Sequence, residues 1–314
     1  MARTGLPQLG DRLFLTDSGL ETSLIFKDGY ELPEFASFVL LDDESGRERL
    51  ARYYRAHAAI AKSVGAGFIF ESVGWRASSD WGSRIGYDAD ALARVNRDSI
   101  TLMSEVRAEF DSPEMPTVLS GCVGPRGDAY RPAELMNAEE AEAYHRAQIS
   151  TYATTEADMV TALTLTYSAE ASGIVRAASG VDLPVAISFT VETDGSLPSG
   201  ETIRDAIGAV DDATGAAASY FMINCAHPAH FDAVLEDEAA WTRRIRGVRA
   251  NSSRKSHAEL DESTELDAGD PVELAALYAT LKERFGGLTV LGGCCGTDET
   301  HIQKIAAGVT APQG

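Results

Sequence analysis

The sequence has little positive charge for its size. Its 314 residues include 27 Lys and Arg against 48 Asp and Glu, so 27 − 48 gives a formal net charge of −21. A protein that binds nucleic acid must present clustered positive charge to the phosphate backbone. The acidic balance therefore excludes nucleic acid as an expected partner.

Long hydrophobic runs are missing as well. No window approaches the roughly 18 consecutive apolar residues of a membrane-spanning helix, and residues 1–7 lack the apolar core of a secretory signal. We therefore expect no membrane contact and a cytoplasmic location. Hydrophobic residues at 44% and charged residues at 24% still allow a folded protein with a sizeable core.

Cysteine is also sparse. The four cysteines, Cys122, Cys225, Cys294 and Cys295, are too few for a disulfide scaffold, and the cytoplasm keeps thiols reduced. Two interpretations remain for them: metal binding, or burial as small hydrophobic side chains.

What the sequence does contain is an alternation of short apolar runs with helix-like stretches. The runs are rich in Val, Ile, Leu and Phe and end in polar or Gly-rich turns, which is typical of successive βα units. The predicted strands cover residues 12–17, 67–71, 117–122, 158–164, 184–190, 220–225, 247–250 and 288–294. The predicted helices cover residues 47–65, 88–110, 138–157, 168–179, 202–214 and 271–285.

Eight strands with intervening helices favour an α/β fold, a (β/α)8 TIM barrel that forms a single domain over residues 1–314. A doubly wound open sheet is the rival architecture, and it often shows a G-x-G-x-x-G motif after its first strand. Here the first strand leads into Asp-Ser-Gly-Leu-Glu-Thr at residues 17–22. A barrel would assemble its active site at the carboxyl ends of the strands.

Three cysteines stand at such strand ends. Cys225 ends the sixth predicted strand, and Cys294 and Cys295 end the eighth. Neighbouring strand residues point to opposite faces, so the last two can share a metal only if the backbone turns, which the adjacent glycines permit. Three thiolates at a barrel mouth would form a soft site suited to Zn²⁺, with sulfur about 2.3 Å from the metal and a fourth position open for catalysis.

Two neighbours of this trio remain open. Cys122 also ends a predicted strand, and its participation would turn the open site into a closed structural Cys₄ site. His227 fits a metal ligand, a turn contact before Pro228 or a substrate contact equally well.

Two carboxylates are candidates for substrate binding. Asp17 ends the first predicted strand and Glu71 ends the second, so both can face the barrel mouth and bind an ammonium group through charge-assisted hydrogen bonds. The alternatives are a helix cap or turn for Asp17, and an internal ion pair with Arg76 or Arg84 for Glu71.

One basic segment follows the seventh predicted strand. Residues 251–255 read Asn-Ser-Ser-Arg-Lys and lie near the place where barrels often hold anions. A grip on a substrate carboxylate and a solvated basic turn are equally compatible with this composition.

Together these motifs resemble the zinc-dependent homocysteine S-methyltransferase family. The most specific elements are Asn224-Cys225 and the Gly-Gly-Cys-Cys-Gly of residues 292–296, which look like the family's metal-binding motifs; residues 17–22 and 121–125 add support. The resemblance covers nearly the whole chain. It implies a (β/α)8 barrel in which zinc holds an acceptor thiolate that attacks a methyl group on a sulfonium, ammonium or folate donor.

The resemblance also assigns roles by position. Cys225, Cys294 and Cys295 would be the zinc ligands and the catalytic centre, and Asp17 with the backbone around Ser18 would lie beside the amino acid part of homocysteine.

Two positions depart from the family pattern. Ser18 stands where the family usually has glycine, and Leu163 stands where many members have a glutamate that holds the substrate amino group. Glu71 would be able to compensate from another side of the mouth.

The expected function is transfer of a methyl group from a small donor to the thiol of homocysteine, which gives methionine. The alternatives are alkylation of another small thiol or selenol, and a zinc-binding or redox-sensing barrel without turnover. The sequence leaves the methyl donor and the oligomeric state open.

Overall fold

The computed structural model describes residues 5–261 and 265–311. Within these ranges, eight parallel strands pair in chain order and close into a barrel through β1 and β8. The strands are β1 (Phe14–Leu15), β2 (Gly67–Glu71), β3 (Thr117–Val123), β4 (Met159–Leu165), β5 (Val185–Phe189), β6 (Tyr220–Asn224), β7 (Ile245–Ala250) and β8 (Val290–Gly293). The closed order confirms the predicted (β/α)8 barrel and excludes the open sheet.

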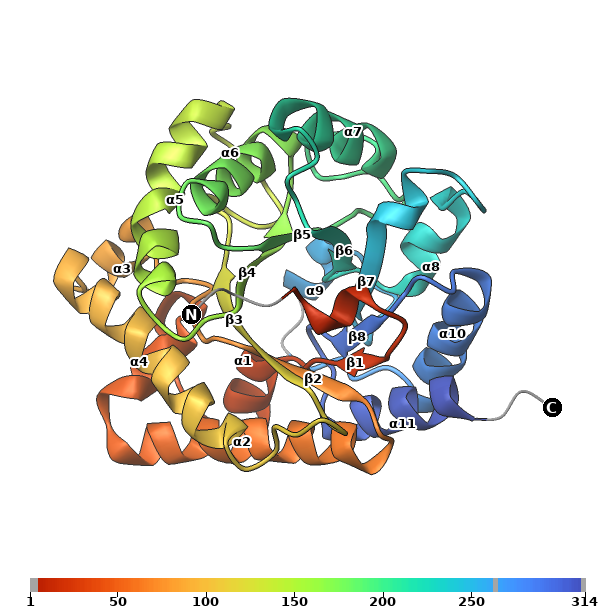
Figure 1. The fold of residues 1–314 in the computed structure, drawn as a ribbon, viewed down its shortest axis with the longest axis horizontal. Coiled ribbons are helices and arrows are strands. Elements are labelled where there is room, and N and C mark those ends of the chain that lie inside the picture. The colour runs from red at the N-terminus through yellow and green to blue at the C-terminus, as the bar shows by residue number, and fades with distance from the viewer. Residues whose placement is uncertain (1–4, 262–264, 312–314) are drawn as a thin grey trace.

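Helices surround this barrel on its outer side (Figure 1). The longer ones are α2 (Glu44–Ser63), α4 (Ala89–Arg107), α5 (Ala138–Ala153), α6 (Ser168–Ser179), α7 (Ile203–Thr214), α10 (Pro271–Arg284) and α11 (Glu299–Thr310). The shorter ones are α1 (Leu20–Thr22), α3 (Ser79–Arg84), α8 (Pro228–Phe231) and α9 (His257–Asp261). Helices α2 and α11 pack against each other, so the outer ring closes as the barrel does.

Strand β1 and helix α11 differ from the sequence prediction, and the short helices α1, α3, α8 and α9 were not predicted either. Strand β1 is shorter than predicted, although beyond Leu15 the backbone still bonds the β8 side, from Thr16 N to Leu291 O at 2.8 Å. Helix α11 was not predicted; the Asp298 carboxylate caps its first turn by accepting a hydrogen bond from Thr300 N at 2.9 Å.

The barrel interior changes character along its axis. Its amino-terminal part is filled by an apolar cluster that is separate from the larger core between strands and helices: Leu6, Phe14, Ile69, Val118, Met159, Ala186, Tyr220, Met222 and Val290. Side chains on one strand face recur every second residue. Two residues further along, the same faces carry Glu71, Ser120, Thr161, Ser188, Asn224 and Arg249. The polar floor of the barrel mouth is therefore built by the strands themselves.

In the described part of the chain, no helix is both long and apolar enough to cross a membrane. Residues 1–4, on which part of the expectation about a secretory signal depends, lie outside the described residues.

Candidate metal centre and substrate site

The structure brings the three predicted cysteines together. Cys225 follows β6, whereas Cys294 and Cys295 follow β8, and their Sγ atoms all lie within 4.8 Å of one another. The Sγ atoms of Cys225 and Cys295 are 3.9 Å apart, and those of Cys225 and Cys294 are in disulfide contact. Cys225 is buried, Cys294 is half-buried and Cys295 is exposed, so the cluster is open to solvent on one side.

The donor set fits a zinc ion. Tetrahedral coordination with bonds of about 2.3 Å places sulfur atoms roughly 3.8 Å apart, which matches the separation of Cys225 and Cys295. Three thiolates are soft ligands of the kind that select zinc. The disulfide contact of Cys225 with Cys294 and joint coordination by both thiolates are mutually exclusive, so this pair must be reduced before both can hold a metal.

The backbone around each cysteine is shaped for this convergence. Cys225 has a φ of +54°, a left-handed conformation that is unfavourable outside glycine and common at functional sites. Hydrogen bonds hold it there, from Cys225 N to Arg249 O at 3.1 Å and from Asn251 Nδ2 to Cys225 O at 3.0 Å. After the other two cysteines, Gly296 has a φ of +80°. The backbone turn that the glycines around Cys294 and Cys295 predicted is therefore present.

Asn224 joins the strands beneath the sulfur atoms. Its Oδ1 accepts hydrogen bonds from Thr164 N at 2.8 Å and Ser188 Oγ at 2.6 Å, and its Nδ2 donates to Thr164 Oγ1 at 2.8 Å. The same Nδ2 lies 3.9 Å from Cys294 Sγ, and Thr164 Oγ1 lies 3.9 Å from Cys225 Sγ. The buried side chain of Asn224 therefore contacts Cys294 directly and Cys225 through Thr164.

The sequence left the roles of Cys122 and His227 open, and the structure places both in contacts within the fold. Cys122 is buried on β3 and is not a member of the sulfur cluster, and burial raises the pKa of its thiol. His227 makes the turn contact, because its Nδ1 accepts a hydrogen bond from Ala229 N at 3.2 Å at the start of α8. Burial, together with nearby Arg254 and His230, lowers the pKa of His227 to about 4.

Asp17 lies in a buried ion pair. Its Oδ1 accepts a hydrogen bond from Arg249 Nη2 at 2.6 Å, and its Oδ2 accepts one from Tyr53 Oη at 3.2 Å. Burial alone would lower the pKa of Arg249, but Asp17 and Glu71 raise it, so this guanidinium stays charged. Sequence reasoning missed Arg249; its signal was a charged residue near the carboxyl end of a strand, between the apolar Val248 and Ala250.

Ser18 faces helix α2. Its Oγ lies 2.9 Å from His57 Nε2 and 3.2 Å from Tyr53 Oη, and its backbone N donates to Tyr53 Oη at 3.1 Å. The part that Asp17 and Ser18 play in substrate binding remains a prediction.

Glu71 reaches the barrel floor at the end of β2. Its Oε1 accepts a hydrogen bond from Thr161 Oγ1 at 2.9 Å, while its buried Oε2 has no hydrogen-bond partner among the described residues. Burial raises the pKa of Glu71 to about 7, against the opposing effect of Arg249. The alternative ion pairs are not formed, because Arg84 pairs with Glu34 at 3.4 Å and Arg76 stacks between two indole rings.

The basic segment after β7 forms a turn whose two cationic side chains lie beside carboxylates. Arg254 pairs with Glu273, and Lys255 lies 3.6 Å from Asp267. Ser252 N donates to Cys295 O at 3.1 Å. The segment thus supports the cysteine loop, and its two cations already face carboxylates.

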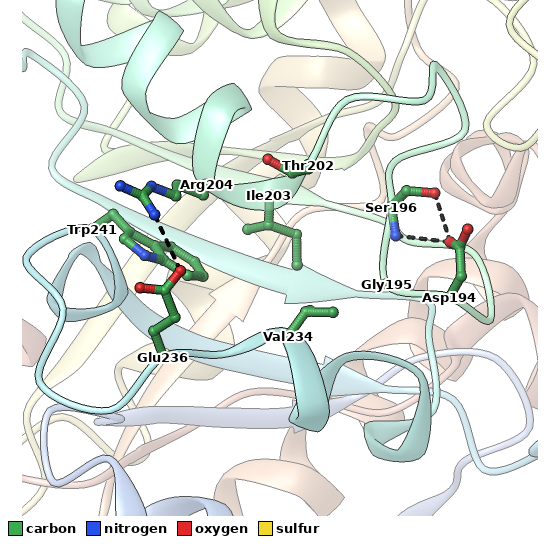
Figure 2. A pocket seen from close by; sticks show the side chains of 9 residues that line it. All are labelled: Asp194, Gly195, Ser196, Thr202, Ile203, Arg204, Val234, Glu236 and Trp241. Atoms are coloured by element: carbon green, nitrogen blue, oxygen red, sulfur yellow. Dashed lines mark hydrogen bonds and ion pairs between the residues drawn. The ribbon is translucent and has the colours of Figure 1, made fainter.

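A separate cavity of about 220 Å³ lies between the start of α7 and the segment before β7 (Figure 2). Ile203, Val234 and Trp241 supply its apolar walls, and the ion pair of Arg204 with Glu236 lies across one side. None of the residues predicted for the site lines it.

Proteins named as homocysteine S-methyltransferases are similar to this chain in sequence. The chain is 26% identical over 173 residues to homocysteine S-methyltransferase 3 of Arabidopsis thaliana, a match that covers 54% of this chain and 49% of the relative. It is 25% identical over 268 residues to the homocysteine S-methyltransferase YbgG of Bacillus subtilis strain 168, covering 81% of this chain and 80% of the relative. The first of these matches therefore spans about half the length of the relative.

Solved structures share the fold. The metallated form of the homocysteine methyltransferase MmuM from Escherichia coli superposes with a TM-score of 0.71 at 18% identity, and its oxidized form with 0.74 at 20%. Each comparison covers 95% of this chain and 96% of the other. The model of the family described as homocysteine S-methyltransferase matches residues 15–309. Because that match runs through the whole barrel and both cysteine motifs, the chain belongs to the homocysteine S-methyltransferase family.

Proposed function

We propose that this protein transfers a methyl group from a small donor to the thiol of homocysteine, in a zinc-dependent reaction that yields methionine. The observation that carries the proposal is the convergence of Cys225, Cys294 and Cys295 within 4.8 Å at the carboxyl ends of β6 and β8. Family membership supplies the reaction class.

The three thiolates would hold the metal. A free thiol has a pKa of about 8.5 and is mostly protonated at neutral pH, whereas a bound Zn²⁺ would keep the acceptor thiol deprotonated. Asn224 accepts a hydrogen bond from Thr164 N, and Thr164 Oγ1 contacts Cys225 Sγ, so these two residues support the buried side of the cluster. The exposed side at Cys295 leaves a path for substrates. Orientation of donor and acceptor in line then supplies the rest of the rate enhancement.

The carboxylates of the floor would hold the substrate amino group. Each oxygen of Asp17 already accepts one hydrogen bond, but a carboxylate has about four acceptor sites, so capacity remains. Glu71 Oε2 is buried without a partner. Burial raises the pKa of Glu71 to about 7, and an arriving ammonium group would lower this pKa and favour the ionised form.

The test combines metal content with product analysis. Cys225→Ala, Cys294→Ala and Cys295→Ala should each lose zinc, measured by mass spectrometry of the metal, and should form no methionine with sulfonium, ammonium or folate donors. Cys122→Ala is the matched control, and it should keep both zinc and activity because Cys122 lies outside the cluster. All proteins are loaded under reducing conditions. Full methionine formation by a metal-free triple variant would reject the mechanism, and zinc retention without product from any donor would support a non-catalytic barrel.

A second candidate, alkylation of a different small thiol or selenol, is favoured by one position. Leu163 puts an apolar side chain where many family members have the glutamate for the amino group, and it is largely buried at the mouth. An acceptor panel decides: if 4-mercaptobutanoate, which lacks the amino group, reacts as well as homocysteine, the amino group is not recognised and the second candidate holds.

A further inference from the structure

Arg76 is a buried cation clamped between two aromatic rings. It lies in the segment between β2 and α3 and is 7% exposed. Its Cζ is 4.0 Å from the ring centroid of Trp75 and 3.5 Å from that of Trp81. These two cation–π contacts restrict the orientation of the guanidinium and leave its N–H groups for hydrogen bonds.

Two of these N–H donors are unused. The Nε and Nη1 atoms of Arg76 are buried without a hydrogen-bond partner, and among the residues described by the structure Arg76 forms no ion pair. The nearby Asp128 uses Oδ1 to accept hydrogen bonds from two backbone N–H groups instead. Burial lowers the pKa of Arg76 to about 10, so it is still charged at neutral pH. A buried cation without an ion-pair partner is costly, and a bound anion would reduce that cost.

Arg76 and its two tryptophans lie at the same end of the barrel as the cysteines. Trp75 Nε1 donates a hydrogen bond to Leu163 O at 3.2 Å, and the next residue, Thr164, contacts Cys225 Sγ through its Oγ1 at 3.9 Å. Trp81 Nε1 donates to Pro125 O at 3.2 Å, just after β3. Both rings are therefore anchored near the carboxyl ends of strands, Trp75 on β4 and Trp81 just after β3.

We propose that Arg76 binds the carboxylate of a small substrate beside the cysteine cluster. This inference rests on the proposed function and names the group by which that site recognises its substrate. The charged N–H groups of a guanidinium form strong hydrogen bonds with a carboxylate. Leu163 leaves β4 without a carboxylate for the substrate ammonium group, so a cation that binds the substrate carboxylate would add to the recognition by Asp17 and Glu71. The carboxylate comes either from the acceptor thiol or from an amino acid methyl donor.

The fluorescence of Trp75 and Trp81 provides the readout of binding. The sequence has three tryptophans, and the third, Trp241, lines the separate cavity of Figure 2. In a Trp241→Phe protein, fluorescence therefore reports on Trp75 and Trp81. Homocysteine and 4-mercaptobutanoate should give saturable changes, whereas 3-aminopropane-1-thiol, which lacks the carboxylate, should bind about 10- to 100-fold more weakly.

Adding Arg76→Gln to this protein should raise the Kd of homocysteine by the same 10- to 100-fold. The matched control is Arg84→Gln, because Arg84 also lies over Trp81, at 4.3 Å, but is exposed and already paired with Glu34. It should leave the Kd unchanged. If Arg76→Gln instead raises only the KM of an amino acid donor such as S-methylmethionine, the carboxylate belongs to the donor.

Two results would overturn the inference. One is equal binding of homocysteine and 3-aminopropane-1-thiol, with no donor carboxylate effect, in the protein that retains Arg76; this comparison does not depend on the folding of any Arg76 variant. The other is a folded Arg76→Gln protein with unchanged Kd and KM values. Because fluorescence measures binding alone, absence of methyl transfer would reject the proposed function without deciding the carboxylate site.

Discussion

Arg249 Nη2 donates a hydrogen bond of 2.6 Å to Asp17 Oδ1 across 232 residues of sequence. The same guanidinium donates from Nε to Gly293 O at 3.1 Å, at the end of β8. Arg249 on β7 thus connects the segment after β1 to the backbone that precedes Cys294. The buried pair fixes the geometry of the seam where the barrel closes.

Removing one partner of this pair should destabilise the fold strongly. Arg249→Met leaves the Asp17 carboxylate buried without its cation, and we expect the free energy of unfolding to fall by about 3–5 kcal/mol. Asp17→Asn/Arg249→Met should lose less than the sum of the single variants, because it leaves no unpaired charge. Urea unfolding of the four proteins measures this difference, and strictly additive losses would contradict the pairing.

The origin of this pair shows what the sequence can and cannot predict. The barrel follows from local alternation of apolar runs and helices, and the cysteine cluster follows from cysteines at strand ends, two of which are flanked by glycine. Asp17 was recognised as a strand-end carboxylate, but its partner Arg249 was not, because pairing between distant strands has no local signature. Arg76 was considered only as a partner for Glu71, since the stacking of two indoles on it depends on how the β2–α3 segment folds back.

Glu71 should make stability depend on pH. Its pKa rises from an ordinary 4.5 to about 7 in the folded protein, so between these values the folded state binds more protons than the unfolded state. Stability should therefore fall as pH rises through this window, by at most about 3 kcal/mol at pH 8. Glu71→Gln has no such titration and should be more stable than the parent at pH 8 but not at pH 4.5. Urea unfolding at both values checks this, and equal pH profiles would contradict it.

Asn224 should control metal affinity without being a ligand. Asn224→Ala removes the acceptor for Thr164 N and the donor near Cys294 Sγ, so zinc affinity should fall by about 10- to 100-fold. Asn96→Ala is the matched control, because Asn96 is equally buried but bonds Ala77 O and Leu92 O, away from the cluster. Competition with a chelator measures both affinities. Equal losses in the two variants would mean that Asn224 acts only through general stability.

Gly296 provides a test of the turn that presents the cysteines. Its φ of +80° disfavours any side chain, and a Cβ there would overlap Ser252 Oγ and come within 2.9 Å of Asp267 O. We expect Gly296→Ala to displace Cys295 and to reduce zinc content and methyl transfer at least tenfold, with a smaller effect on unfolding. Gly287→Ala, before β8, is the control, since a Cβ at Gly287 meets nothing within 4 Å. Metal content and activity of the two folded variants decide the matter: a Gly296→Ala protein that keeps its zinc would show that the cysteine turn tolerates another backbone path.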